Sequence, residues 1–510
     1  MHWTTLATLP LILAPLAAAQ APCYVRPEWR ELTPAQQTTY FNAVNALKSR
    51  PMLGTKLNWL DPGTLSYDDF VWIHFSTVTM NAHSHPSFLP WHRLFTLLYE
   101  KALQSTNPNG GIVLPYWDWT IDSQAPEQSS VFAQFGGNGV APNYCVTNGA
   151  FAGWQTNPSG NWAVAKTSIR GSAAITPVDC LSRNFLSGAT LYSVETTAQI
   201  INGGANATDF YGFASPLEMG PHASVHNFVG GQLGDMTQFY STNDPLFFML
   251  HGMVDKVFSM WQDVCPSLRR NLYNGITSAG VAVSPNDLLD VYGIAVHLAL
   301  DPTNILGACY SYSKSMADSN LIQMLPTSVC PGGPASSVTQ TSPAPSPTAV
   351  ASPLPGSDSW MQSAILQLIN VPPGSHFVFP IANDTSSSSK VVKRDGAADE
   401  SKIQKHDKSP TATKKICEAP LPTYSPMPNI TVMAPPAHDR TDMVHIRHPL
   451  SLSDDYIKTM GMNPHKVRAH EIKMKHVVDY YNNIKNYLSP SALIHKKNHT
   501  KSTSDSHASS

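Results

Sequence analysis

Six histidines in the first 300 residues fall into two groups of three whose spacing suggests metal binding. The groups are His74, His83, His92 and His222, His226, His251. The first three lie nine residues apart, whereas His222 and His226 are four apart and would share one face of a helix. Imidazole suits zinc, copper, iron and nickel, and a three-histidine site leaves coordination positions open for a substrate or oxygen. The pattern predicts two three-nitrogen metal sites.

The surroundings of two of these histidines are strongly apolar. His92 lies in the stretch FLPWHR at 88–93, and His251 ends the stretch DPLFFMLH at 244–251. A run this apolar has little reason to contain histidine unless the ring is a metal ligand or a buried hydrogen-bond donor. Asp255 follows His251 by one helical turn and is predicted to orient its imidazole.

The elements that must position these residues are expected to be helices. Pro34 and Pro245 each follow a capping residue, an arrangement typical of a helix start. The expected helices are Thr33–Leu47, Asp68–Thr79, Trp91–Leu103, Pro221–Phe228 and Asp244–Asp263. Residues 125–215 are rich in Gly, Ser, Asn and Pro and should be mostly loop. We therefore expect a mainly α protein, with a four-helix-bundle core around a dinuclear metal site and long loops.

These motifs together resemble the tyrosinase, catechol oxidase and haemocyanin family, in particular its fungal secreted branch. FLPWHR is similar to the signature of the first metal site, and D-P-x-F-F-x-x-H-x-x-x-D at 244–255 to that of the second. The resemblance runs from about residue 23 to 312. Further matching marks are His222-x-x-x-His226 before Gly230-Gly231, PYWDW at 115–119, Arg26-x-Glu28-Trp29 and Tyr310-Ser311-Tyr312.

The resemblance implies a role for each matching residue. His74, His83 and His92 would bind one copper ion, and His222, His226 and His251 the other. Glu218 matches an acidic residue that orients a water for phenol deprotonation, Ala223 stands where monophenol-hydroxylating relatives often have Asn, and Phe247 would line the pocket. Family members often have a cysteine, crosslinked to the second histidine, where this chain has Asn81. We therefore predict no thioether, and we expect His85 to lie near the ligands or at the surface.

Three functions remain open at this point. The leading one is a secreted enzyme with two copper ions that oxidises o-diphenols or o-aminophenols to quinones with O2, for pigment or secondary metabolism. Ala223 and Asn81 favour diphenol oxidation over monophenol hydroxylation. Six histidines serve zinc equally well. Some fungal members of this fold bind zinc and act as lyases that convert cyclopenin-type compounds to viridicatin. The third reading is an oxygen carrier or an inactive scaffold.

Residues 1–21 are predicted to be a cleaved secretory signal, because an apolar stretch is followed by small residues. Six of the seven cysteines lie between 23 and 330, and structural disulfides are expected, with 15 pairings open. Four glycosylation sequons agree with secretion; they begin at Asn206, Asn383, Asn429 and Asn498. A net charge of −2 argues against a wholly basic nucleic-acid-binding surface, and no second apolar run suggests a membrane span. The oligomeric state is not predictable.

The remaining sequence is predicted to be divided into a 22–330 catalytic domain, a Pro/Ser-rich linker at 331–356 and a 357–510 extension. The extension is basic, with 19 Lys and Arg against 14 Asp and Glu from residue 356 onward, and 10 of the 20 histidines lie from His406 onward. Lys393-Arg394 is a dibasic pair at which cleavage is plausible. We expect a largely irregular, solvated polar tail with short elements at 360–369 and 376–381 and one helix near 470–488.

Overall fold

The structure is a computed structural model that describes residues 23–54, 58–59, 61–77, 81–156, 179–203, 208–325, 330, 445–485 and 487–495. Several sequence predictions lie outside these residues. They are the signal at 1–21, the linker at 331–356, the elements at 360–369 and 376–381, the Lys393-Arg394 pair, Cys417 and the four sequons.

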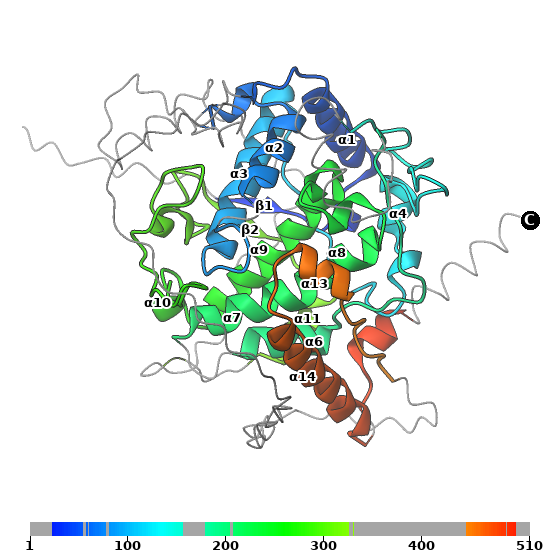
Figure 1. Cartoon of the computed structure of the whole chain (residues 1–510), viewed down its shortest axis with the longest axis vertical. Helices are drawn as coiled ribbons and strands as arrows, with labels where there is room; N and C mark the ends of the chain where they lie inside the picture. Colours follow the sequence, from blue (N-terminus) through cyan, green and yellow to red (C-terminus); the bar gives the residue numbers. More distant parts are fainter. Residues whose placement is uncertain are drawn as a thin grey trace, which may run out of the picture.

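Four helical segments form the centre of the molecule, as the histidine pattern predicted (Figure 1). They are α2 (Tyr67–Thr77), α3 (Phe88–Thr106), α9 (Leu246–Val264) and a π turn, Glu218–His222, that runs into α8 (Ala223–Gly230). The expected ranges 68–79, 91–103, 221–228 and 244–263 therefore mark these helices to within a few residues. This confirms the mainly α fold with a helical-bundle core.

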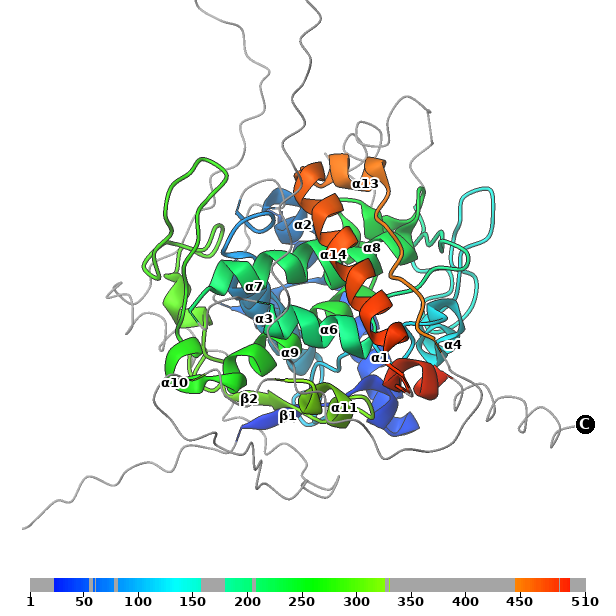
Figure 2. The same cartoon turned by 90° about the horizontal axis from the view of Figure 1, so that it is seen from below.

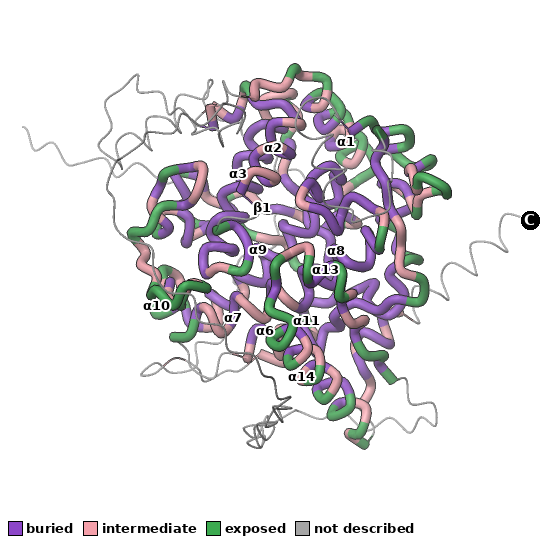
Figure 3. The backbone as a smooth tube through the Cα atoms, viewed as in Figure 1, coloured by how far each residue is buried: buried purple, intermediate pink, exposed green. Residues whose placement is uncertain are grey.

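Helices α3 and α9 are apolar on nearly every side, which places them in the interior rather than at the surface (Figure 3). Most of the charged residues that they carry are buried, and burial of a charge requires a partner. Arg93 of α3 bonds to Asp255 of α9, and Glu100 accepts a 2.7 Å hydrogen bond from Arg26. These pairs lock the two helices to each other and to the start of the chain.

A small parallel sheet joins the beginning and the end of the region from residue 23 to 312. Strand β1 (Tyr24–Arg26) pairs with β2 (Tyr310–Tyr312), with Tyr24 opposite Tyr310 and Arg26 opposite Tyr312. The Cys23–Cys309 disulfide lies beside this pairing. The two family motifs that begin at Arg26 and Tyr310 are therefore neighbours in the structure.

The other helices surround this centre. They are α1 (Pro34–Lys48), α4 (Ser130–Phe135), α6 (Val194–Asn202), α7 (Phe210–Leu217), α10 (Pro266–Arg269) and α11 (Asp318–Gln323). Helix α1 begins at Pro34 behind its cap Thr33, as predicted. The described part of 125–215 is mostly loop, but the prediction missed α4, α6 and the start of α7. The cap of α6, Ser193, accepts a hydrogen bond from Thr196 N, and Val194, Ala198 and Ile201 are buried on one face.

Six cysteines form three disulfides, as expected for the region from 23 to 330. The pairs are Cys23–Cys309, Cys145–Cys180 and Cys265–Cys330. The last pair ties residue 330, just before the linker, to the end of α9. Of the described helices, none is both long and apolar enough to cross a membrane.

Residues 445–495 pack against the catalytic region, so the prediction of a solvated tail is wrong for this segment. It contains α13 (Asp454–Thr459) and α14 (Pro464–Asn483), and α14 crosses the molecule beside α6 (Figure 2). Its buried apolar side chains include Ile446, Tyr456, Ile457, Val467, Met474, Val477, Val478 and Tyr481. Because α14 starts at its cap Asn463, it begins six residues before the expected 470. We call residues 445–495 the C-terminal cover.

Candidate metal centre

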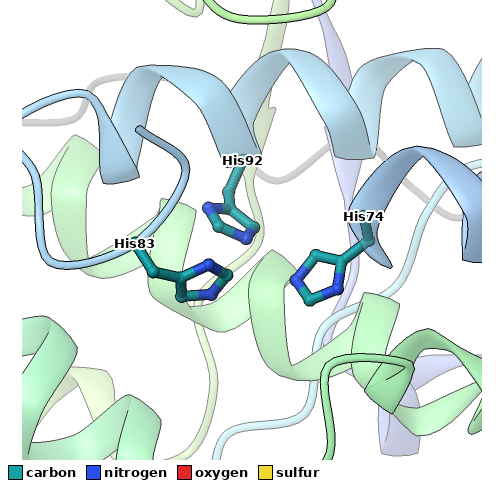
Figure 4. A group of neighbouring side chains, drawn as sticks. All are labelled: His74, His83 and His92. Carbon is teal, nitrogen blue, oxygen red and sulfur yellow. The ribbon is translucent and has the colours of Figure 1, made fainter. Parts of the chain in front are cut away.

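The two predicted histidine groups are each assembled into a compact, buried cluster. In each group, one ring nitrogen of every histidine lies within 4.8 Å of one ring nitrogen of the other two. Figure 4 shows the first cluster, in which His74 comes from α2, His92 from α3 and His83 from the loop between them. In the second cluster His222 ends the π turn, His226 lies on α8 and His251 on α9.

The two clusters face each other and form one centre. The His92 and His251 rings stack with centroids 4.2 Å apart and planes 12° apart, and the His83 and His222 centroids are 6.0 Å apart. Such contact between clusters means that ions bound to them would be neighbours. The arrangement is that of a dinuclear metal site.

Backbone carbonyls fix the orientation of four of the six rings. The Nδ1 atoms of His74, His92, His222 and His226 lie 3.0, 2.9, 3.1 and 2.7 Å from the carbonyl oxygens of Phe239, Phe88, Glu218 and Met236. A hydrogen bond from Nδ1–H leaves the Nε2 lone pair free for an ion. The Nε2 atoms of these four histidines are buried and have no hydrogen-bond partner in the described structure.

The charge state of the rings also suits a metal. Burial lowers the pKa of His74 to about 3 and that of His226 to about 4, and it lowers the pKa of the other four well below the usual value. Neutral imidazole is the form that binds metals. A buried ring nitrogen without a partner costs free energy. Each cluster brings three such nitrogens together, so the two clusters fit two metal ions. Both copper and zinc accept such ligands.

Two aromatic rings contact both clusters. Phe247, which was predicted to line the pocket, has its centroid 4.9 Å from that of His74 and 4.1 Å from that of His251. Phe88, which sequence reasoning missed, lies 4.8 Å from His92 and 4.9 Å from His222. Its position one turn before His92, on the same helix face, was the available signal. The two rings surround the centre with apolar surface.

Glu218 lies at the edge of the centre, in the π turn that carries His222. Its carboxylate is buried, and Oε1 accepts a 2.7 Å hydrogen bond from the backbone N–H of Ser84. Burial raises the Glu218 pKa to about 8, and the Ser84 hydrogen bond opposes this rise. A carboxyl group with so high a pKa is suited to exchanging a proton near neutral pH.

Ala223, the residue after His222, is fully buried beneath the C-terminal cover. It packs with Leu452, Tyr456, Ile457, Met462 and Val467 of the cover, together with Met219 and Met460. The Tyr456 hydroxyl is buried and has no hydrogen-bond partner in the part that the structure describes. Burial raises the Tyr456 pKa, and the negative charge of Glu218 adds to this rise. Met219, the residue after Glu218, packs against the same apolar cluster. The cover therefore lies over the Glu218 side of the metal centre.

The prediction that Asp255 orients His251 is wrong. The Asp255 carboxylate accepts hydrogen bonds from Arg93 Nε and from the hydroxyls of Tyr310 and Tyr312, at 2.7 Å for Tyr310. Both ring nitrogens of His251 have no hydrogen-bond partner among the described residues. Tyr310 and Tyr312 belong to strand β2, 55 and 57 residues further along the chain. Asp255 therefore joins α9 to the sheet.

His85 and Asn81 flank His83 in the loop before α3. His85 Nδ1 lies 2.7 Å from the Ser87 hydroxyl, and His85 belongs to neither metal cluster, as expected. The backbone N–H of Asn81 donates to Asp290 Oδ2 at 3.0 Å. The loop that carries His83 is therefore held by hydrogen bonds.

Comparison with known proteins agrees with this geometry. Residues 64–264 match the family described as the common central domain of tyrosinase. The chain is 32% identical over 264 residues to tyrosinase-like protein phomQ1 of Diaporthe leptostromiformis, covering 48% of this chain and 63% of that one. It is 32% identical to tyrosinase ustQ of Aspergillus flavus (49% and 67% covered) and 35% identical to a tyrosinase of Streptomyces antibioticus (39% and 74% covered).

The chain belongs to the tyrosinase family. The match spans somewhat less than two thirds of the phomQ1 sequence and about half of this chain. The family match at 64–264 covers all six clustered histidines and ends before the linker and the cover.

Proposed function

We propose that this chain is a secreted copper enzyme that oxidises o-diphenols or o-aminophenols to o-quinones with O2, in pigment or secondary-metabolite synthesis. The observation that carries the proposal is the pair of facing histidine clusters, with four buried Nε2 atoms that have no partner among the described residues. Two bound copper ions would supply one-electron redox steps at a pair of adjacent sites. His74, His83 and His92 would hold one ion, and His222, His226 and His251 the other.

The other residues of the site support a small aromatic substrate. Phe88 and Phe247 offer apolar ring surface beside both histidine clusters. Glu218, with its raised pKa, is placed to accept the proton of a phenolic hydroxyl, directly or through a water. The small Ala223 at the position after His222 favours diphenols over monophenols.

We also propose that the chain is organised as a signal at 1–21, a catalytic domain at 22–330, a linker at 331–356 and an extension at 357–510 that is cut near 394. Tyr456 and its apolar neighbours lie over the Glu218 side of the centre. A substrate that approaches from this side requires the cover to move. The expected activity of the intact chain is therefore low until α13 is displaced.

The test measures bound metal and reaction in parallel. Full-length protein is produced in a fungal host with copper and zinc both supplied, and metal per chain is determined. Oxygen uptake with catechol is then followed for the full chain and for Ile457→Asp, which places a charge in the apolar contact of α13. We expect about two copper ions per chain, with faster oxygen uptake in I457D. Two zinc ions, with no oxygen uptake in either form, would instead support a zinc-dependent lyase.

A further inference from the structure

His83 is held in place differently from the other five clustered histidines. Four of the others have Nδ1 bonded to a carbonyl, and His251 is packed between His92 and Phe247, with centroids at 4.2 and 4.1 Å. His83 lies on a loop, and its Nδ1 has no hydrogen-bond partner among the described residues. Its ring packs against those of His74 and His92, with centroids at 5.2 and 4.9 Å, so its position depends on this packing and on how the loop backbone is fixed.

That backbone is fixed at the next residue. Ser84 adopts a φ of 52°, a left-handed conformation that is uncommon for residues other than glycine. Its N–H donates a 2.7 Å hydrogen bond to Oε1 of the buried Glu218. Because the Glu218 carboxyl group is buried, breaking this hydrogen bond would leave a polar group without a partner, so it can hold a loop in a less favoured conformation.

Glu218 is connected to the second cluster as well. Its backbone carbonyl accepts the hydrogen bond from His222 Nδ1 at 3.1 Å, and the π turn Glu218–His222 fixes its distance from that ligand. A π turn of this kind is an interruption of the helix that is often found at functional sites. One residue thus contacts the backbone beside a ligand of the first cluster and the ring of a ligand of the second.

We propose that Glu218 is a positioning residue that places His83 for the first metal, through its hydrogen bond to Ser84 N–H. The role is separate from any proton transfer by Glu218. The proposal rests on the two-metal centre of the proposed function, but not on the reaction or on the identity of the metal.

The test uses three substitutions that separate hydrogen bonding from charge. Glu218→Gln keeps an oxygen acceptor at the same reach and loses the charge. Glu218→Asp keeps the charge but is one methylene too short, and Glu218→Ala loses both. Each full-length, metal-free protein is titrated with zinc ions against a chelator, and the copper-loaded forms are examined by EPR for isolated Cu(II). Glu195→Ala is the matched control, since Glu195 is also fully buried but bonds to the cover.

We expect wild type, E218Q and E195A to bind two zinc ions. In E218D and E218A the weaker of the two ions should bind at least tenfold less tightly, because residues that orient metal ligands typically change affinity by this much. Copper-loaded E218A should then show the signal of isolated Cu(II). Two zinc ions bound with unchanged affinity in E218D, or weakened binding in E218Q, would overturn the proposal.

Three further outcomes can be told apart. If E218A and E218D do not fold, E218Q alone decides, since the proposal requires that it bind both ions as wild type does. If wild type itself binds no metal, the proposed function is wrong, and the proposed role of Glu218 is wrong as well. If wild type binds two ions but does not oxidise catechol, the reaction fails while the zinc titration still decides the role of Glu218.

Discussion

His83 and His85 lie two residues apart in one loop, but their rings face different surroundings. His83 belongs to the first cluster, whereas His85 bonds to the Ser87 hydroxyl. Removing one of three nitrogen ligands should abolish tight binding at that site. We predict that His83→Ala lowers bound metal from two ions to one per chain, while His85→Ala retains two. Metal analysis after dialysis checks this, and a loss of metal in H85A would show that the cluster assignment is wrong.

The predicted metal ligands differ in how clearly the sequence indicates their role. His92 and His251 stand out because they interrupt apolar runs, and His222 and His226 because they share a helix face. The contacts of Asp255 could not be predicted from its spacing to His251. Its partners Arg93 and Tyr310 lie far away in the sequence, and only the folded β1–β2 pairing brings them close.

At the scale of elements, Asp255 connects helix α9 to α3 and to the sheet. Arg93, Tyr310 and Tyr312 all bond to its buried carboxylate, which is 4% exposed. Replacing one member of a buried ion pair leaves the other charge without compensation. We predict that Asp255→Asn lowers the free energy of unfolding by about 3 kcal/mol, measured by urea denaturation of the metal-free protein. The variant should still bind two metal ions, because its ligands are untouched. Loss of one ion without loss of stability would restore the role that the sequence suggested for Asp255.

Helix α14 carries a buried histidine that makes its docking depend on pH. The His470 ring stacks on Tyr192, with centroids 6.0 Å apart, and its Nε2 lies close to Gly220. Burial, together with the smaller effect of the Lys473 charge, lowers the His470 pKa to about 4. The nearest acid on the helix, Glu471, bonds to Arg468 and to Leu452 N–H.

The sign of the effect follows from these pKa values. An unfolded or undocked His470 takes up a proton below about pH 6.5, whereas the docked ring does so only near pH 4. Docking is therefore weakened as pH falls through this window. We predict faster amide hydrogen exchange in α14 at pH 5 than at pH 7, after correction for intrinsic rates, and a smaller difference in His470→Phe. An equal difference in both proteins would exclude His470 as the cause.

At the scale of the whole molecule, the cover is joined to the catalytic region by more than the intervening chain. The hydroxyls of Ser489 and Ser491 donate to Glu195 at 2.6 and 3.1 Å, and Leu450 N–H donates to the Thr190 carbonyl at 3.0 Å. The apolar faces of α13 and α14 are buried as well. Buried apolar area stabilises such contacts whether or not the connecting chain is intact.

We therefore predict that cutting the chain near residue 394 does not by itself release the cover. After limited proteolysis, the 445–495 fragment should still elute with the catalytic region in size-exclusion chromatography. Combining I457D with Glu195→Ala should allow the fragment to separate after the same cut. Separation from the otherwise unmodified cleaved protein would show that the linker is what keeps the cover in place.

The sequence predicted the catalytic half of the molecule much better than the cover. The histidine spacing and the proline-led helix starts are local signals, and they correspond to α1, α2, α3, α8 and α9. The cover is held by contacts between residues more than 200 positions apart, such as Ser453 with Asn227. Its basic, histidine-rich composition suggested a solvated tail, because the buried face of α14 is only one stripe of that helix. Helix α6 was missed because it lies within a loop-like composition.

We propose that two copper ions bound by the six histidines oxidise diphenols. This proposal is tested most directly by measuring catechol-dependent oxygen uptake and bound copper together in I457D and in I457D combined with His226→Ala. We expect two bound copper ions and rapid oxygen uptake in I457D. In the double variant, we expect at most one tightly bound ion and no uptake above the background of free copper. Equal oxygen uptake in the two proteins, or two bound copper ions with no uptake in I457D, would contradict the proposal.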